Sequence, residues 1–144
     1  MTGLTPAQFF SPEGEPIACP DPAAGLYIRS RKGETLRVPL PPDAIAYQIG
    51  EAAQVHTGGI LQATPHCVRA AAEAGVGRGT LAVFMEPQWD AIMSTPTGAK
   101  PENVLRGARG ELLPKGVPPL ASRWEASGKQ TFGEFTNKTL SMYY

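Results

Sequence analysis

Several features that would point to a simple class of protein are scarce in this chain. Only two of its 144 residues are cysteine, at positions 19 and 67. This excludes a disulfide framework and favours a reducing, cytoplasmic compartment. No apolar run approaches the roughly 20 residues that a membrane helix requires. The N-terminal residues lack the basic segment and apolar run of a secretory signal, so we expect neither export nor a membrane span.

Net charge is also absent, because thirteen Lys and Arg residues offset thirteen Asp and Glu residues. No electrostatic argument therefore favours binding to nucleic acid or to an anionic membrane. Basic residues gather between positions 29 and 37, but no aromatic residues alternate with them. We interpret them as a solvated face and expect no nucleic-acid partner.

Glycine and proline are abundant, at 16 and 15 residues, and predict many turns and no long helices. Short runs alternate between apolar and other side chains, which is typical of β-strands. After an apolar opening at 4–10, these runs predict a hairpin over 25–40 and strands over 45–49, 60–69 and 80–85. Since no segment has the length of a crossover helix, we expect a mainly β chain with antiparallel strands.

The chain changes character after Trp89. Residues 94–119 are rich in proline and glycine and predict a loop or connector. Thr131 and Glu134 have the spacing of a capping box, which predicts a short C-terminal helix. We therefore divide the chain into a β part, 1–93, and an irregular extension, 94–144, that ends in a helix.

Three polar residues of the β part are candidates for a binding site. His66 lies in the predicted strand 60–69, and alternation places it on one face with Thr64 and Val68. Arg78 and Thr80 would share a face, and a guanidinium with a hydroxyl can hold a carboxylate. By spacing alone, the commoner interpretations are a hydrogen-bonded strand histidine and a solvated Arg-x-Thr pair.

The order of motifs between residues 25 and 87 resembles the C-terminal half of the isopenicillin N synthase-like iron- and 2-oxoglutarate-dependent dioxygenases. The matching motifs, in order, are Gly25-Leu26-Tyr27-Ile28, Val38-Pro39, Pro42-Asp43, Ile49-Gly50-Glu51, Gly58-Gly59, Thr64-Pro65-His66 and Arg78-Gly79-Thr80. The resemblance implies part of a double-stranded β-helix, or jelly roll, over residues 1–93.

The resemblance also implies a chemistry. His66 would be the distal ligand of Fe(II), and Arg78 and Thr80 would bind the far carboxylate of 2-oxoglutarate. The complete enzyme would use O2 to oxidise a small organic substrate. However, these residues contain no His-x-Asp or His-x-Glu, so two of the three iron ligands are missing. We expect a fragment or truncated relative that is inactive alone, because one imidazole is not a facial triad.

Two residues could in principle rebuild the iron site. A hairpin with its turn at Gly58-Gly59 would place Glu51 opposite His66, but a shift of one residue changes this pairing. We favour a structural or solvated Glu51, a locally hydrogen-bonded His56, and a buried, unreactive Cys67 on the face opposite to His66.

The alternative to an oxygenase fragment is a non-catalytic β module for binding or assembly. An incomplete barrel exposes unpaired sheet edges, and such edges favour self-association.

Overall fold

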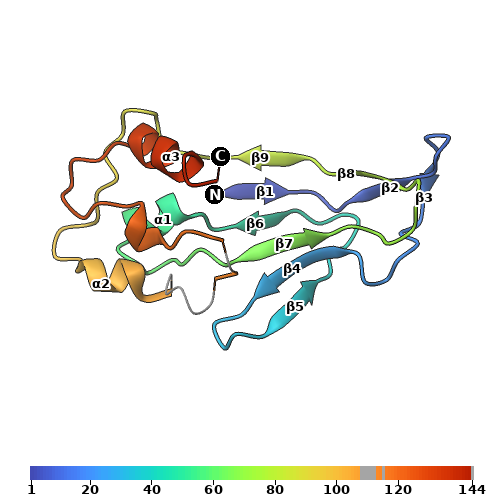
Figure 1. Ribbon diagram of the computed structural model, residues 1–144, viewed down its shortest axis with the longest axis horizontal. Helices are drawn as coiled ribbons and strands as arrows, with labels where there is room; N and C mark the ends of the chain where they lie inside the picture. Colours follow the sequence, from blue (N-terminus) through green and yellow to red (C-terminus); the bar gives the residue numbers. More distant parts are fainter. Residues whose placement is uncertain (108–112, 115, 144) are drawn as a thin grey trace. The chain divides into compact units, whose positions relative to one another are not determined.

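The computed structural model describes residues 1–107, 113, 114 and 116–143. It is mainly β, with nine short strands in three antiparallel sheets and a few short helices (Figure 1). Two compact units divide the chain. The strand unit comprises residues 2–48 and 64–84, and the helical unit comprises Met1, 49–63 and the described part of 85–144.

The first two sheets of the strand unit share two chain segments, and each sheet adds a third strand of its own. In one sheet β1 (Thr2–Leu4) lies between β6 (Ala46–Gln48) and β9 (Ala82–Phe84). In the other, β2 (Gln8–Phe10) lies between β3 (Pro16–Ile17) and β8 (Gly77–Gly79). The segment 2–10 thus runs antiparallel to 77–84 through both sheets.

The register between these two segments shifts by one residue at their midpoint. Thr2 opposes Phe84 and Gln8 opposes Gly79, so six steps along one segment match five along the other. The extra residue lies near Pro6, between β1 and β2. Proline suits such a bulge because it has no N–H to donate to a ladder.

The third sheet contains the predicted hairpin. β4 (Gly25–Arg29) and β5 (Thr35–Val38) pair antiparallel, and β7 (His66–Arg69) adds to the other side of β4. Gly33 has a φ of 83°, and the Ser30 N–H donates to the Glu34 carbonyl at 2.8 Å to close the turn. This pairing confirms the hairpin predicted over 25–40. The hairpin could be predicted because its sequence signals are local.

The prediction of a strand over 60–69 is wrong for its first half. Helix α1 (Glu51–His56) precedes it, and strand β7 begins only at His66. Gly58 and Gly59 both have positive φ, and the Gly59 N–H donates to the Gln54 carbonyl at 2.9 Å, so these glycines end the helix. The hairpin that would have paired Glu51 with His66 does not form.

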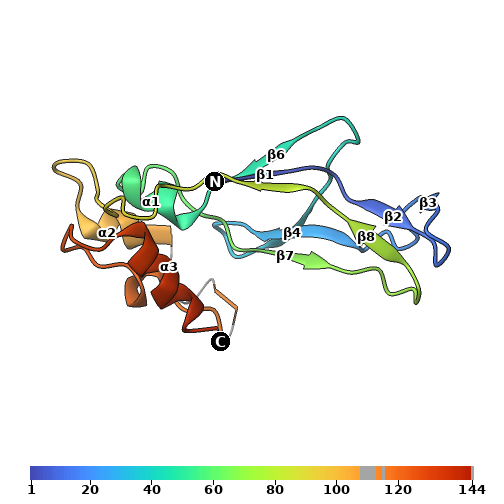
Figure 2. The ribbon, with the colours of Figure 1, turned by 90° about the horizontal axis from the view of Figure 1, so that it is seen from above.

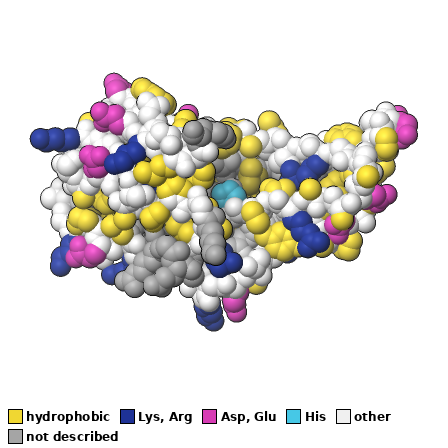
Figure 3. Space-filling model, viewed as in Figure 1, with side chains coloured by type: hydrophobic (Ala, Val, Ile, Leu, Met, Phe, Trp, Pro, Cys, Tyr) yellow, Lys and Arg dark blue, Asp and Glu magenta, His cyan; other side chains and the backbone are white. Residues whose placement is uncertain are grey.

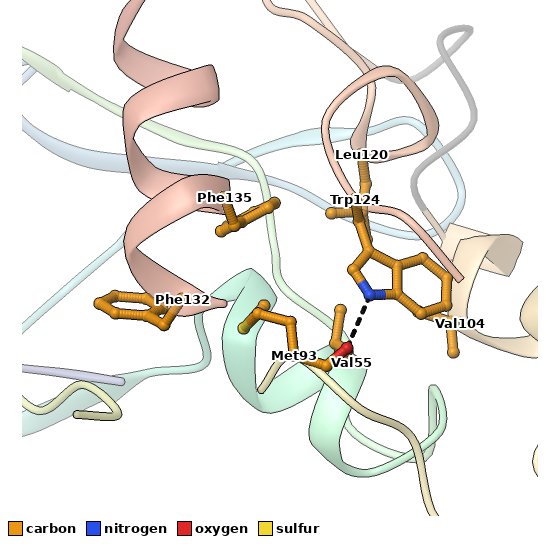
Figure 4. Close-up of a cluster of buried hydrophobic side chains, with 7 residues drawn as sticks. All are labelled: Val55, Met93, Val104, Leu120, Trp124, Phe132 and Phe135. Atoms are coloured by element: carbon orange, nitrogen blue, oxygen red, sulfur yellow. Dashed lines mark hydrogen bonds between the residues drawn. The ribbon is translucent and has the colours of Figure 1, made fainter. Parts of the chain in front are cut away.

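A cluster of buried side chains holds the helical unit together (Figure 4). Its members are Val55, Met93, Val104, Leu120, Trp124, Phe132 and Phe135. The Trp124 indole N–H, buried with its ring, donates to the Met93 carbonyl at 3.0 Å. Burial of each large apolar side chain stabilises the fold by about 1.5–3 kcal/mol.

Two helices follow α1 in this unit, α2 (Pro101–Val104) and α3 (Phe132–Leu140), with 3-10 turns η1 (Leu105–Gly107) and η3 (Leu120–Ser122). The predicted C-terminal helix is confirmed as α3. Thr131 accepts from the Glu134 N–H, and the Glu134 carboxylate accepts from the Thr131 N–H at 2.8 Å. This is the predicted capping box.

The expected boundary at residues 93 and 94 falls inside the helical unit. Of the expected extension, residues 108–112, 115 and 144 lie outside the described part of the chain. Among the helices that the structure describes, none has the length and apolarity needed to cross a bilayer.

Candidate functional site

His66 is the one polar side chain on an otherwise aliphatic sheet face. It opposes Ile28 across the β4–β7 ladder, and residues that oppose each other project to the same face. The remaining members of this face are Leu26, Ile28, Leu36, Val38 and Val68. The opposite face carries Tyr27, Arg29, Thr35, Arg37, Cys67 and Arg69. β4 and β7 lie side by side in both ribbon views (Figure 2).

The hydrogen bond of His66 defines its tautomer. The Nδ1 atom lies 3.1 Å from the Thr64 carbonyl oxygen, which can only accept. Nδ1 therefore carries a hydrogen and donates it, and in the neutral ring Nε2 keeps a free lone pair. The side chain is exposed, so this nitrogen is accessible. Metal-binding histidines often have this arrangement, with the second ring nitrogen bound to a carbonyl.

Arg78 lies at the centre of β8, opposite Phe9 of β2. Phe9 is buried, whereas the Arg78 side chain is exposed. Within the described chain, the guanidinium has neither an ion-pair partner nor a hydrogen-bond acceptor. Thr80 follows β8 directly and is also exposed. Both groups are thus available to an anion from outside this chain.

Arg78 lies in β8, Thr80 lies between β8 and β9, and His66 belongs to another sheet. His66 belongs to the sheet β5-β4-β7, and Arg78 belongs to β3-β2-β8. The connector between β7 and β8 is tied down by Asp21, whose carboxylate accepts from the Ala23 and Ala72 N–H groups at 2.8 and 3.1 Å. These two backbone hydrogen bonds, in that order, lower the pKa of Asp21. No hydrogen bond links His66 to Arg78 in the part that the structure describes.

The described residues do not supply a complete iron site. No group of three or more His, Cys, Asp or Glu side chains that could hold a metal occurs among residues 1–107, 113, 114 and 116–143. His66 offers a single imidazole, whereas non-haem iron of the resembled family requires two imidazoles and a carboxylate. The described residues therefore fit such an iron site only in part, through the single imidazole of His66.

Glu51 and His56, which could in principle have replaced the missing iron ligands, instead make contacts within the helical unit. Glu51 forms an ion pair with Arg123 at 2.6 Å, which confirms the structural interpretation of this acid. His56 Nδ1 lies 3.1 Å from the Ser94 carbonyl. The predicted hydrogen bond of His56 exists, but it spans 38 residues and is not local.

Cys67 differs from its expected state. It projects to the face opposite to His66, as alternation predicts, but it is exposed and not buried. Cys19 is also exposed and lines an open depression of about 350 Å³ between β2 and β3. This depression includes none of the predicted site residues.

In the space-filling view, apolar side chains reach the surface in many places, and basic and acidic side chains lie among them (Figure 3). Large apolar residues are widely exposed, with Ile60 at 83% and Phe84 at 72%.

The amino-acid sequence contains no local signal for the most buried ionic residue that the structure describes. Arg123 is 3% exposed and binds Glu51, which lies 72 positions earlier in the chain. A single arginine in a loop-rich segment carries no sequence signal for such a partner.

Comparisons with known proteins found no family model, no curated protein and no solved structure that matches the chain.

Proposed function

We propose that this chain is the C-terminal part of a non-haem Fe(II)- and 2-oxoglutarate-dependent oxygenase with a jelly-roll fold. In the whole enzyme, the metal centre would supply the oxidation of a small organic substrate by O2. The observation that carries the proposal is the setting of His66, a single imidazole on an aliphatic sheet face with Nε2 free.

The strand pairing is consistent with part of a jelly roll. Segments 2–10 and 77–84 pair antiparallel, and β6 adds beside β1. The chain leaves these sheets after β3, forms β4 and β5, and returns at β6. It leaves again to form β7 and returns at β8. Such alternation between sheets is a property of jelly rolls.

Arg78 and Thr80 support the co-substrate assignment. A guanidinium that has no partner among the described residues, two positions from an exposed hydroxyl, can bind a carboxylate through two N–H donors and one O–H donor. No acid of the described chain forms an ion pair with Arg78. We therefore assign the far carboxylate of 2-oxoglutarate to this pair.

The chain alone should not catalyse the oxidation reaction. With ferrous iron, ascorbate and 2-oxoglutarate, we expect no succinate above a protein-free control, because only one iron ligand is present. Sustained succinate formation would contradict the assignment of His66 as the one ligand here.

The family assignment is tested on the polypeptide encoded in frame upstream of Met1. We expect a His-x-Asp or His-x-Glu in that segment, and a longer protein that binds Fe(II) and forms succinate. His66→Ala should remove both properties, and the matched control His56→Ala should remove neither. An upstream frame without this motif, or turnover that His66→Ala leaves intact, would overturn the proposal.

The second candidate, a non-catalytic module for binding or assembly, is supported by exposed apolar side chains on the strands. Tyr47, Val83 and Phe84 are 62%, 53% and 72% exposed. If the upstream frame contains a stop codon and the chain is still a stable, expressed protein, this candidate is favoured.

A further inference from the structure

We propose that the outer edge of strand β9 pairs with the same edge of a second copy of the chain, which forms an antiparallel dimer. This edge comprises the outward backbone groups of Ala82 and Phe84, with Val83 between them. The proposal concerns the chain as it stands and does not rest on the oxygenase assignment.

The hydrogen bonds of β9 to β1 determine which groups point outward. The Leu81 carbonyl accepts from the Thr5 N–H at 3.1 Å, and the Leu81 N–H donates to Thr5 Oγ1 at 3.1 Å. Leu81 therefore points its backbone groups toward β1. Because this direction alternates along an antiparallel strand, Val83 also points toward β1. The N–H and C=O groups of Ala82 and Phe84 point away from it.

The outward groups are unpaired and unprotected. β9 is the last strand of its sheet, and no hydrogen bond reaches the Ala82 or Phe84 backbone from any residue that the structure describes. Soluble proteins usually protect such edges with charges, proline or a covering segment. The run Leu81-Ala82-Val83-Phe84-Met85 has no charge and no proline, and Leu81 is 63% exposed.

A second copy fits this edge because the edge is self-complementary. If Val83 opposes Val83 of the other copy, Ala82 opposes Phe84 in both directions. The outward groups of these residues then meet and form two hydrogen-bonded rings, or about four hydrogen bonds. The same pairing places each Phe84 ring beside the small Ala82 side chain, where a large side chain has room.

The edge of β6, on the other side of the same sheet, is less suited to pairing with a second copy of itself. Since Gly3 points toward β9, alternation directs Thr2 and Leu4 toward β6, where they oppose Gln48 and Ala46. Only Tyr47 then has outward groups in β6. Self-pairing about Tyr47 would form one ring, whereas β9 forms two.

The proposal is tested by sedimentation equilibrium of the purified chain from low to high micromolar concentration. We expect a reversible monomer–dimer equilibrium. Ala82→Pro removes an outward N–H without breaking a bond to β1, and should give a folded monomer. Phe84→Lys should weaken the dimer at least tenfold. The matched control Tyr47→Lys should leave it unchanged.

Hydrogen exchange of the unmodified chain gives a second readout that does not depend on how the variants fold. We expect protection of the Ala82 and Phe84 amides to rise with protein concentration, while the Tyr47 amide stays unprotected. A monomer at all concentrations, a dimer lost through Tyr47→Lys, or concentration-independent exchange at Ala82 and Phe84 would overturn the proposal.

Discussion

Arg123 and Glu51 form a bidentate ion pair, with both guanidinium nitrogens Nη1 and Nη2 at 2.6 Å from the two carboxylate oxygens. The arginine side chain is 4% exposed and the glutamate side chain 29% exposed. Arg123 also donates to the Pro118 carbonyl at 3.0 Å, and its guanidinium lies 5.6 Å from the Phe135 ring centre. The pair joins the start of α1 to the C-terminal part of the helical unit.

Glu51→Ala should lower the free energy of unfolding by about 3 kcal/mol, because it leaves a buried guanidinium without its counter-charge. Urea denaturation followed by circular dichroism measures this loss. Glu125→Ala is the matched control, since Glu125 and Lys138 form an exposed ion pair at 3.1 Å. Its cost should be about 0–1 kcal/mol. Equal losses in the two variants would contradict a structural role for the buried pair.

Gly59→Ala should destabilise the helical unit by at least about 3 kcal/mol, measured in the same way. Gly59 has a φ of 84°, and an added Cβ would overlap the Asn103 carbonyl oxygen at α2. Gly128→Ala is the control, because Gly128 has a φ of 68° with no atom within 4 Å of its Cβ position. Its cost should be only the backbone strain, about 1–2 kcal/mol. A smaller loss for Gly59→Ala than for Gly128→Ala would argue against close packing of α2 here.

Acidification should destabilise the strand unit partly through Asp21. Backbone hydrogen bonds from Ala23 and Ala72 lower the pKa of this carboxyl below its ordinary value. A lowered pKa in the folded state means stability that is present above the unfolded pKa and is lost as the pH falls through the folded pKa. Asp21→Asn should therefore flatten the fall in stability below about pH 4, relative to the unmodified chain.

Denaturation midpoints measured at several pH values between neutrality and strong acid test this dependence. Asp43→Asn serves as the control, because Asp43 is exposed and accepts no hydrogen bond in the described chain. Parallel stability curves for the unmodified chain and Asp21→Asn would exclude Asp21 as a source of acid sensitivity.

His66→Ala should change the free energy of unfolding by no more than about 0.5 kcal/mol, because exposed side chains away from special contacts contribute little. The imidazole is exposed, and its one hydrogen bond reaches only to Thr64. By contrast, Phe9→Ala, which removes a buried side chain of β2, should cost about 3–5 kcal/mol. A loss above about 1.5 kcal/mol for His66→Ala would indicate a structural histidine and weaken the case for a ligand.

The parts of the fold that could be predicted are those whose signals are local. The hairpin 25–38 has alternating strands and a Gly33 turn, and α3 has a capping box between Thr131 and Glu134. The placement of Cys67 opposite to His66 followed from alternation alone. The exposure of Cys67 could not follow from it, because exposure depends on which elements cover the strand.

The amino-acid sequence by itself determined the mainly β character, the turns and the capped C-terminal helix, because each depends on residues within a few positions of one another. The tertiary structure decided that 51–56 is a helix, that Glu51 pairs with Arg123, and that the register shifts near Pro6. The physical reason is distance along the chain. Helix α1 is stabilised by burial of Val55 in a cluster that also contains Val104 and Leu120, and no local pattern encodes contacts between such remote segments.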